Sequence, residues 1–184
     1  MSTVYLIRHG MTEANEKRLY CGSTDIPLSD AGIAALRELH YAVKNAVFLT
    51  GGMKRTEQTL ALLFGNVPHR QEPRFREMDF GSFEMRGYAV LKNDPSYQEW
   101  ITGDNESKPT PNGESGKQMQ KRALEAFFEL YPPKRDTVII THGGVISAIM
   151  AHLFPQEAKT RYEWQPDPGH GYAITRNRYS PIPK

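Results

Sequence analysis

The sequence has a single cysteine, Cys21, which excludes an intrachain disulfide and any zinc site built from several cysteines. Long apolar runs are missing too. The longest candidate, Val145 to Phe154, has about half of the ~20 residues that a membrane-spanning helix needs. At the amino terminus, four apolar residues precede Arg8, which is too few for a signal-peptide core of roughly 7–15 residues. We therefore expect a cytoplasmic protein with a reduced thiol.

An excess of one charge is also missing, since 23 lysines and arginines face 21 aspartates and glutamates, for a formal net charge of +2. This balance predicts neither nucleic acid nor a membrane as partner, although it is compatible with a local cationic pocket. The 184 residues are 39% hydrophobic and 24% charged, as in ordinary globular proteins. Because about 100–200 residues form a typical domain, residues 1–184 are predicted to be one domain. The sequence does not indicate an oligomeric state.

Short apolar runs alternate with segments of helical pattern. The predicted β-strands are residues 4–7, 47–50, 137–141 and 172–175. The predicted helices are residues 31–44, 55–64, 114–131 and a segment from 144 to just before Pro155. Strands that are apolar throughout suit a sheet covered on both faces. The alternation therefore predicts an α/β fold, a three-layer sandwich with a mainly parallel central sheet and helices on both faces.

Residues 68–111 depart from this alternation because they combine five prolines with six aromatic residues between Phe75 and Trp100. We expect this segment to be an insertion packed beside the sheet, a small and partly helical subdomain. Two interpretations of its aromatic residues stay open. They form a small core, or they belong to a lid that shapes a substrate pocket.

Cationic and imidazole side chains follow three of the predicted strands. Arg8 and His9 follow the first strand, Arg55 follows the second after a short turn, and His142 follows the third. Ligands of open α/β sheets bind outside the carboxyl ends of the strands. The sequence therefore predicts that two arginines and two histidines meet in one crevice.

This combination suits a phosphoryl group. Arginine supplies a fixed charge and a fork of donors, and an unprotonated histidine can act as a nucleophile and form a phosphohistidine. Nearby arginines favour the neutral imidazole by repulsion of like charge. The leaving alkoxide needs a proton, which a carboxylic acid with a pKa raised by the phosphate dianion can supply. Spacing alone does not choose among the candidate acids, which are Glu13, Asp25, Glu57, Glu77, Asp79, Glu84 and Glu114.

The run from Leu6 to Asn15 resembles the signature of the histidine phosphatase superfamily, the phosphoglycerate mutase-like proteins. Other segments resemble further motifs of that family and occur in the family's order: residues 21–32, 54–59, 75–84, 111–115 and 141–145. Each motif alone is weak evidence, whereas the ordered set covers most of the chain and is specific.

The resemblance implies a metal-independent phosphomonoester hydrolase that acts on a small phosphorylated metabolite and needs no cofactor. It implies that His9 is the nucleophile that becomes phosphorylated. It implies that Glu77 protonates the leaving group and then activates water. The resemblance assigns phosphate or substrate binding to Arg8, Asn15, Gly22, Arg55, His142 and Gly143.

Within the family, the short chain and the tail from Trp164 to Tyr172 resemble the α-ribazole phosphatase branch, because the cofactor-dependent mutases are usually longer. Three alternatives stay open: a phosphoglycerate mutase-type phosphoryl transfer, a non-catalytic phospho-ligand binding module, and a protein-phosphohistidine phosphatase. Asn15 has the alternative role of capping a turn. Glu114 is interpreted as a first-turn helix carboxylate outside the site, and Cys21 as part of the pocket wall.

Overall fold

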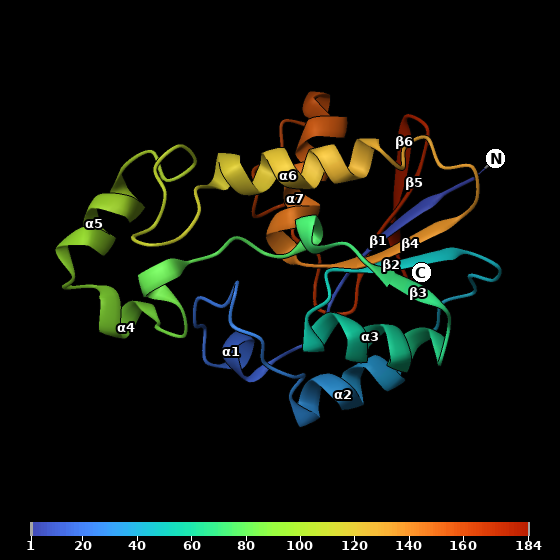
Figure 1. The fold of residues 1–184 in the computed structure, drawn as a ribbon, viewed down its shortest axis with the longest axis horizontal. Coiled ribbons are helices and arrows are strands. Elements are labelled where there is room, and N and C mark those ends of the chain that lie inside the picture. Colours follow the sequence, from blue (N-terminus) through green and yellow to red (C-terminus); the bar gives the residue numbers. More distant parts are fainter. Residues whose placement is uncertain (1, 184) are drawn as a thin grey trace.

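A six-stranded sheet forms the centre of the computed structural model, which describes residues 2–183 (Figure 1). Its strands are β1 (Val4–Arg8), β2 (Val47–Thr50), β3 (His69–Gln71), β4 (Thr137–Thr141), β5 (Gly171–Thr175) and β6 (Arg178–Ile182). They lie in the order β3-β2-β4-β1-β5-β6. The first four in this order are parallel to one another, and β5 and β6 are added antiparallel. The predicted mainly parallel sheet is thus confirmed.

Helices cover both faces of the sheet, with α6 and α7 on one side and α2 and α3 on the other (Figure 1). The helices are α1 (Glu13–Glu16), α2 (Asp30–Arg37), α3 (Lys54–Phe64), α4 (Tyr88–Leu91), α5 (Pro95–Thr102), α6 (Gly116–Phe128) and α7 (Gly143–Leu153). Three short 3-10 helices occur at Pro73–Phe75, Gly81–Phe83 and Pro155–Glu157. No helix in residues 2–183 combines the length and the apolar character needed to cross a membrane.

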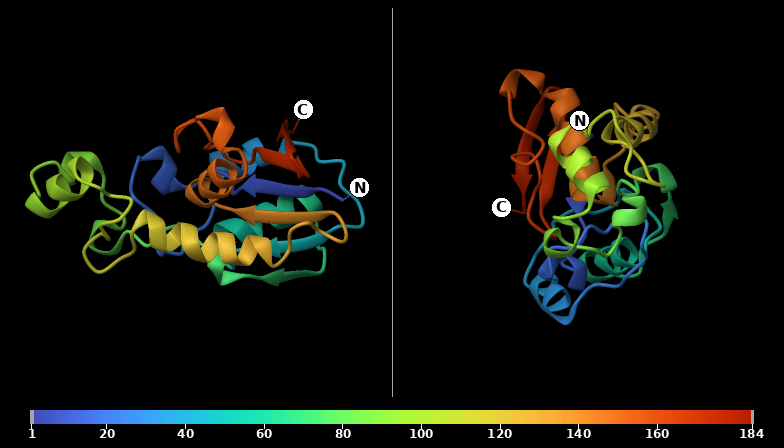
Figure 2. Two further views of the ribbon diagram at one scale, coloured as in Figure 1. Left: turned by 90° about the horizontal axis from the view of Figure 1, so that it is seen from above. Right: turned by 90° about the vertical axis from the view of Figure 1, so that its left-hand side faces the viewer.

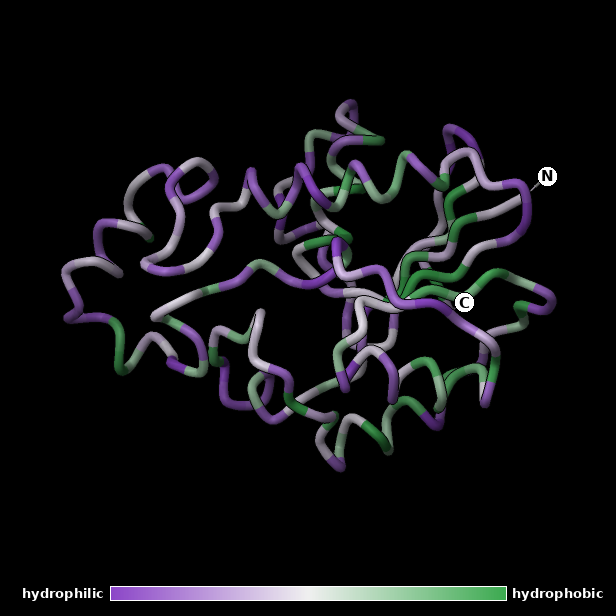
Figure 3. Tube along the Cα trace, viewed as in Figure 1, coloured by the Kyte–Doolittle hydropathy of each residue, from purple (hydrophilic) through white to green (hydrophobic). Residues whose placement is uncertain are grey.

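Successive residues of the central strands point into two different cores. Leu6 and Ile139 join the cluster under α6 and α7, whereas Ile7 and Ile140 join the cluster beside α3. All four side chains are fully buried. Figure 3 shows these hydrophobic strands gathered in the interior, with hydrophilic segments around them. Burial on both faces explains why the strands are apolar throughout, and it confirms the predicted three-layer α/β fold.

The structure confirms all four predicted strands and adds β3 and β6. Neither addition has an apolar run, because β3 consists of three exposed polar residues at one edge and β6 contains Pro181 at the other. Proline is tolerated there because an edge strand leaves half of its amide groups unpaired. Edge strands of this kind carry little sequence signal.

The helix predicted at residues 31–44 is shorter than expected, because α2 ends at Arg37. Beyond that end, Tyr41 and Val43 pack against the second core, and the Tyr41 hydroxyl donates to the Gly169 carbonyl at 2.5 Å. Two residues separated by two positions face the same way only outside a helix. The packing of these side chains therefore requires a non-helical backbone at residues 41–43.

The segment 68–111 is only partly an insertion beside the sheet, because its first residues form β3 within the sheet. The part of the segment with α4 and α5 extends past the end of the strands (Figure 2). The rings of Phe83, Tyr97 and Trp100 lie 5.4 to 6.1 Å apart and are continuous with the main core. These contacts favour the small-core interpretation of the aromatic residues.

Candidate active site

The carboxyl ends of β1 and β4 bring two histidines together. The strands are parallel neighbours, and Arg8 at the end of β1 is in register with Thr141 at the end of β4. The next residues, His9 and His142, have ring centroids 5.0 Å apart at an interplanar angle of 65°. The chain positions thus converge at the sheet edge where the strand-end rule predicted a crevice.

His9 is held with one ring nitrogen free. Its Nδ1 lies 2.6 Å from the Gly10 carbonyl oxygen, and because a carbonyl only accepts, Nδ1 carries the proton. Burial lowers the pKa of His9 to about 3, and the positive charges of Arg55 and Arg8 lower it as well. The imidazole is therefore neutral near pH 7, with an unprotonated Nε2 that is free to attack an electrophile.

His142 is fully buried, and within residues 2–183 neither ring nitrogen has a hydrogen-bond partner. Burial lowers its pKa well below the usual value, with smaller contributions from His9 and Arg55. Buried polar groups are nearly always hydrogen-bonded in folded proteins, and exceptions need an explanation. The explanation consistent with this position, at the amino end of α7, is a polar ligand in the crevice.

Arg55 provides a buried positive charge. It lies in the first turn of α3, is 1% exposed, and donates from Nη2 to the Gly22 carbonyl at 2.7 Å and from Nη1 to the Thr24 carbonyl at 2.9 Å. Carbonyl groups orient the guanidinium but do not neutralise it. Within the described residues Arg55 forms no ion pair, so its charge is available to an anion.

Arg8 provides a second guanidinium next to the amino end of α7. Its Nη1 donates to the Pro166 carbonyl at 2.9 Å, and its buried Nε has no partner within residues 2–183. A Cβ added to Gly143 would lie 3.3 Å from this Nε, so the guanidinium runs close against the first residue of α7. Arg8 and the amino end of α7 therefore supply neighbouring donors for one anion.

Glu77 lies at the amino end of the same helix. Its Oε2 accepts from the Gly144 amide at 2.9 Å, and its Oε1 accepts from the Met78 amide at 3.0 Å. A Cβ added to Gly144 would lie 2.4 Å from Oε1. Gly144 is thus a site residue that the sequence did not single out. Its only signal is that it is the second of two glycines after His142.

Replacing Gly144 with alanine is expected to lower kcat by about 10- to 100-fold, because the new methyl group displaces the Glu77 carboxylate. Gly116→Ala is the matched control. Its Cβ also meets a carboxylate, at 2.3 Å, but that carboxylate belongs to exposed Glu106. The kcat of the control should stay within about twofold of the wild-type kcat. Steady-state kinetics with thermal unfolding checks both variants, and an unchanged kcat for Gly144→Ala would contradict the expectation.

The other candidate acids are engaged elsewhere. Glu84 accepts from the amides of Gly22, Ser23 and Phe80 and from the Thr24 hydroxyl, so it holds the loop that orients Arg55. Glu13 binds Lys17, and Asp25 accepts from the Lys54 amide. Glu57 binds Thr50 and His69, and Asp79 accepts from the Ser23 hydroxyl. Among the seven carboxylates, Glu77 is the one that contacts the helix beginning after His142.

Glu114 corrects the sequence interpretation. It precedes Ser115, the residue that caps α6, so it is not a first-turn carboxylate. It binds the Arg122 guanidinium instead, at 2.7 and 2.8 Å.

Gly22 and Asn15 each have a structural role in addition to the phosphate or substrate binding implied by the resemblance. The Gly22 amide donates to Glu84 and its carbonyl accepts from Arg55, so its backbone supports the arginine. The Asn15 side-chain oxygen accepts from the Thr12 amide at 3.0 Å and caps α1, as the alternative interpretation proposed.

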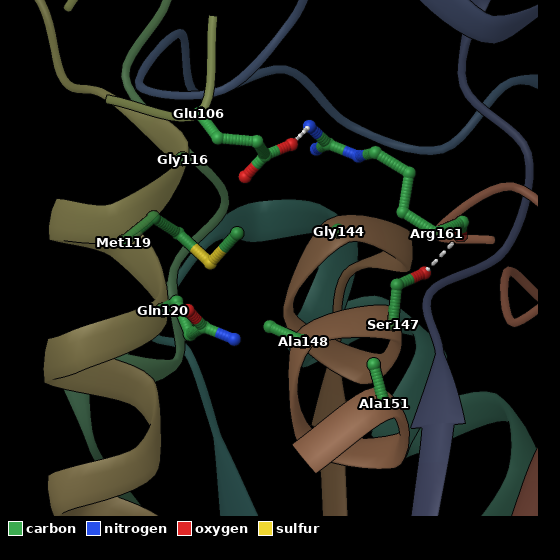
Figure 4. Close-up of a pocket in the computed structure, with 9 residues that line it drawn as sticks. All are labelled: Glu106, Gly116, Met119, Gln120, Gly144, Ser147, Ala148, Ala151 and Arg161. Carbon is green, nitrogen blue, oxygen red and sulfur yellow. Dashed lines mark hydrogen bonds and ion pairs between the residues drawn. The ribbon is translucent and has the colours of Figure 1, made fainter. Parts of the chain in front are cut away.

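A pocket of about 150 Å³ borders Gly144 between α6 and α7 (Figure 4). Its floor includes Met119 and Ala148, and an ion pair between Glu106 and Arg161 crosses it at one end. This pair joins the loop before α6 to the loop after α7.

The buried histidines also make stability depend on pH. The pKa values of His9 and His142 are lower in the folded chain than in the unfolded chain, so protons favour unfolding. As pH falls below about 6.5, both histidines should lower the free energy of unfolding, and for His9 the slope should be about 1.4 kcal/mol per pH unit until pH nears its folded pKa of about 3. Urea denaturation across this range measures the slope. His142→Gln should reduce it, exposed His40→Gln should not, and equal slopes in all three proteins would contradict the prediction.

Known proteins resemble the chain along most of its length. The model of the histidine phosphatase superfamily (branch 1) matches residues 4–182. The chain is 33% identical over 181 residues to an adenosylcobalamin/alpha-ribazole phosphatase of Salmonella typhimurium, covering 93% of this chain and 89% of the relative. It is 29% identical over 179 residues to a 2,3-bisphosphoglycerate-dependent phosphoglycerate mutase 2 of Gloeobacter violaceus, covering 86% and 80%. The solved alpha-ribazole phosphatase of Shigella flexneri superposes with a TM-score of 0.83 at 28% identity, covering 97% and 93%.

Proposed function

This chain belongs to branch 1 of the histidine phosphatase superfamily, and on that basis we propose a metal-independent phosphomonoesterase that works through a phosphohistidine on His9. The observation that carries the proposal is the pair of buried imidazoles 5.0 Å apart, beside two arginines that form no ion pair within residues 2–183. A phosphate ester dianion matches this charge and these donors.

In the first step, Nε2 of His9 forms a bond to phosphorus as the bond to the leaving oxygen breaks. The hydrogen bond from Nδ1 to Gly10 keeps the attacking nitrogen unprotonated. Arg8, Arg55, His142 and the Gly143 amide bind the phosphoryl oxygens, which carry the charge of the transition state. The Asn15 amide nitrogen is a further donor to these oxygens.

Glu77 acts as the acid in the first step and as the base in the second. It gives a proton to the leaving oxygen in the first step, and in the second step it removes a proton from the water that attacks phosphorus. The nitrogen–phosphorus bond then breaks, its electron pair returns to His9, and phosphate is released. The support for this role is the position of the carboxylate on the Gly144 amide, one residue beyond the amide assigned to phosphate.

We propose a small phosphorylated metabolite as the substrate, with α-ribazole phosphate as the first candidate. Relatives and solved neighbours at about 30% identity carry the name alpha-ribazole phosphatase. A mutase is the second candidate, because a relative at 29% identity is named a phosphoglycerate mutase. A mutase returns the phosphoryl group to a sugar acid, whereas a phosphatase gives it to water.

Phosphate release from a panel of esters, with EDTA present, tests the proposal. The panel contains α-ribazole phosphate, 3-phosphoglycerate and p-nitrophenyl phosphate, and 2-phosphoglycerate is assayed as the mutase product. Turnover that resists EDTA supports the phosphatase, and the ester with the highest kcat/KM identifies the substrate class. Formation of 2-phosphoglycerate without net phosphate release would favour the mutase. Absence of both reactions would overturn the proposal.

The remaining assignments belong to the same proposal. Residues 1–184 form one domain with an inserted segment at 68–111, and the protein works in the cytoplasm without nucleic acid or membrane as partner. The balanced charge of the chain supports the lack of a polyanionic partner.

A further inference from the structure

A single arginine outside the phosphate site holds the chain segment that carries Glu77. Arg122 on α6 donates from Nη1 to the carbonyls of Arg74 and Arg76, at 2.8 and 2.7 Å, and from Nη2 to the carbonyl of Glu77 at 2.9 Å. Residues 76–80 form neither helix nor strand. Their carbonyls therefore depend on partners such as this guanidinium.

Glu114 completes the arrangement from the other side. Its carboxylate binds Nε and Nη2 of Arg122 at 2.8 and 2.7 Å, and it also accepts from the Asp79 amide at 3.1 Å. Burial would raise the pKa of Glu114, but the Arg122 guanidinium and the Asp79 amide hold it below its usual value. The pair thus stays charged and grips the backbone at Glu77 and, two residues later, at Asp79.

Within the described residues, Arg122 forms no hydrogen bond to the phosphate-binding groups, and its charge is one of the smaller causes of the lowered His142 pKa. Its hydrogen bonds therefore act on the segment that carries Glu77. The Glu77 side chain reaches the Gly144 amide from a backbone that α6 holds in place. Catalytic groups act only within a narrow range of positions, and neighbouring hydrogen bonds provide that precision.

We propose that Arg122, held by Glu114, is a positioning residue that places Glu77 for proton transfer to the leaving oxygen. This inference rests on the proposed function of Glu77 as the acid. It assigns α6 a part in catalysis although no side chain of α6 touches His9, Arg8 or Arg55 among the described contacts.

Two esters of similar shape separate this role from a purely structural one. p-Nitrophenyl phosphate has a leaving group that departs without help, whereas the much less acidic phenol of phenyl phosphate needs the proton. The first step is measured for each ester as a single-turnover rate, which excludes the hydrolysis step. Glu77→Gln sets the reference, with an expected loss of about 100-fold or more on phenyl phosphate and a far smaller loss on p-nitrophenyl phosphate.

Arg122→Met is expected to show the same asymmetry at reduced size, about 10-fold or more on phenyl phosphate and under about threefold on p-nitrophenyl phosphate. Arg122→Lys should recover part of the rate, because lysine keeps the charge but lacks the planar fork. Arg74→Met is the matched control. The Arg74 side chain lies in the chain segment just before Glu77 and forms ion pairs with Glu72 and Glu129. It contacts neither Glu77 nor Glu114. It should leave both rates within about twofold.

Three outcomes would overturn the inference. Equal losses on both esters in a folded Arg122→Met protein would show a structural role alone. A symmetric Glu77→Gln result would remove the acid assignment itself, and with it the proposed function of Glu77. If Arg122→Met fails to fold, Glu114→Gln and Arg122→Lys replace it, and wild-type rates in both folded variants would contradict the inference.

Discussion

Replacement of His9 by asparagine is expected to lower phosphate release by at least about 1,000-fold, because the variant lacks the nitrogen that accepts the phosphoryl group. The ring is 6% exposed and its Nδ1 is fixed by the Gly10 carbonyl. Only Nε2 is free to attack. Asparagine fits the space of the imidazole and can keep a hydrogen bond to Gly10, so the fold should survive while the chemistry is lost.

Quenched reactions measure this prediction directly. Denaturation in base during turnover should trap a phosphoryl group on the peptide that contains His9, and acid should remove it because phosphohistidine is acid-labile. The His9→Asn protein should carry no trapped phosphoryl group. His152→Gln is the control, because His152 is an exposed histidine on α7 and should behave like the wild type. A phosphoryl group trapped on a different residue, or full turnover by His9→Asn, would contradict the assignment of His9 as the nucleophile.

Loss of the Arg55 charge is the second large effect. Arg55→Met is expected to lower kcat/KM by about 100- to 1,000-fold, because a buried donor aimed at the transition-state charge is removed. Arg55 has two tasks, however, since the same guanidinium binds the carbonyls of Gly22 and Thr24. Part of any loss could therefore come from the loop rather than from the missing charge.

Two further variants separate the tasks. Arg55→Gln keeps an amide donor for the loop but has no charge, whereas Arg55→Lys keeps the charge and loses the fork. If the charge matters most, the lysine variant should retain more activity than the glutamine variant and should bind inorganic phosphate more tightly. The measurement is kcat/KM together with competitive inhibition by phosphate. Higher activity of Arg55→Gln would show that loop anchoring is the main role.

The strand-end rule explains how much of the site is predictable from sequence. Apolar runs locate β1, β2 and β4. Arg8 ends β1, His9 follows it, and His142 follows β4. Parallel strands bring their carboxyl ends to one edge, so the meeting of these side chains follows without knowledge of the loops. The structure places the His9 and His142 rings 5.0 Å apart, as this argument requires.

The acid is not predictable in the same way. Seven carboxylates are available, and what distinguishes them is whether their oxygens are already bound to other groups. Glu84 is bound to amides of residues 22–24, about 60 positions away in the chain, and Glu114 is bound to Arg122. Those contacts arise from loops that meet only in the folded molecule. The local sequence pattern does not predict these contacts. Resemblance to the family was therefore needed to select Glu77.

The buried ring of His142 has a consequence for attempts to make this protein more robust. Its two nitrogens lack partners within residues 2–183, and each such buried group destabilises a fold by about 1–3 kcal/mol. An apolar residue of similar size at position 142 would remove that penalty. Screens that select only for heat resistance would therefore enrich inactive proteins, and stabilising libraries should keep position 142 fixed while they vary the helix surfaces.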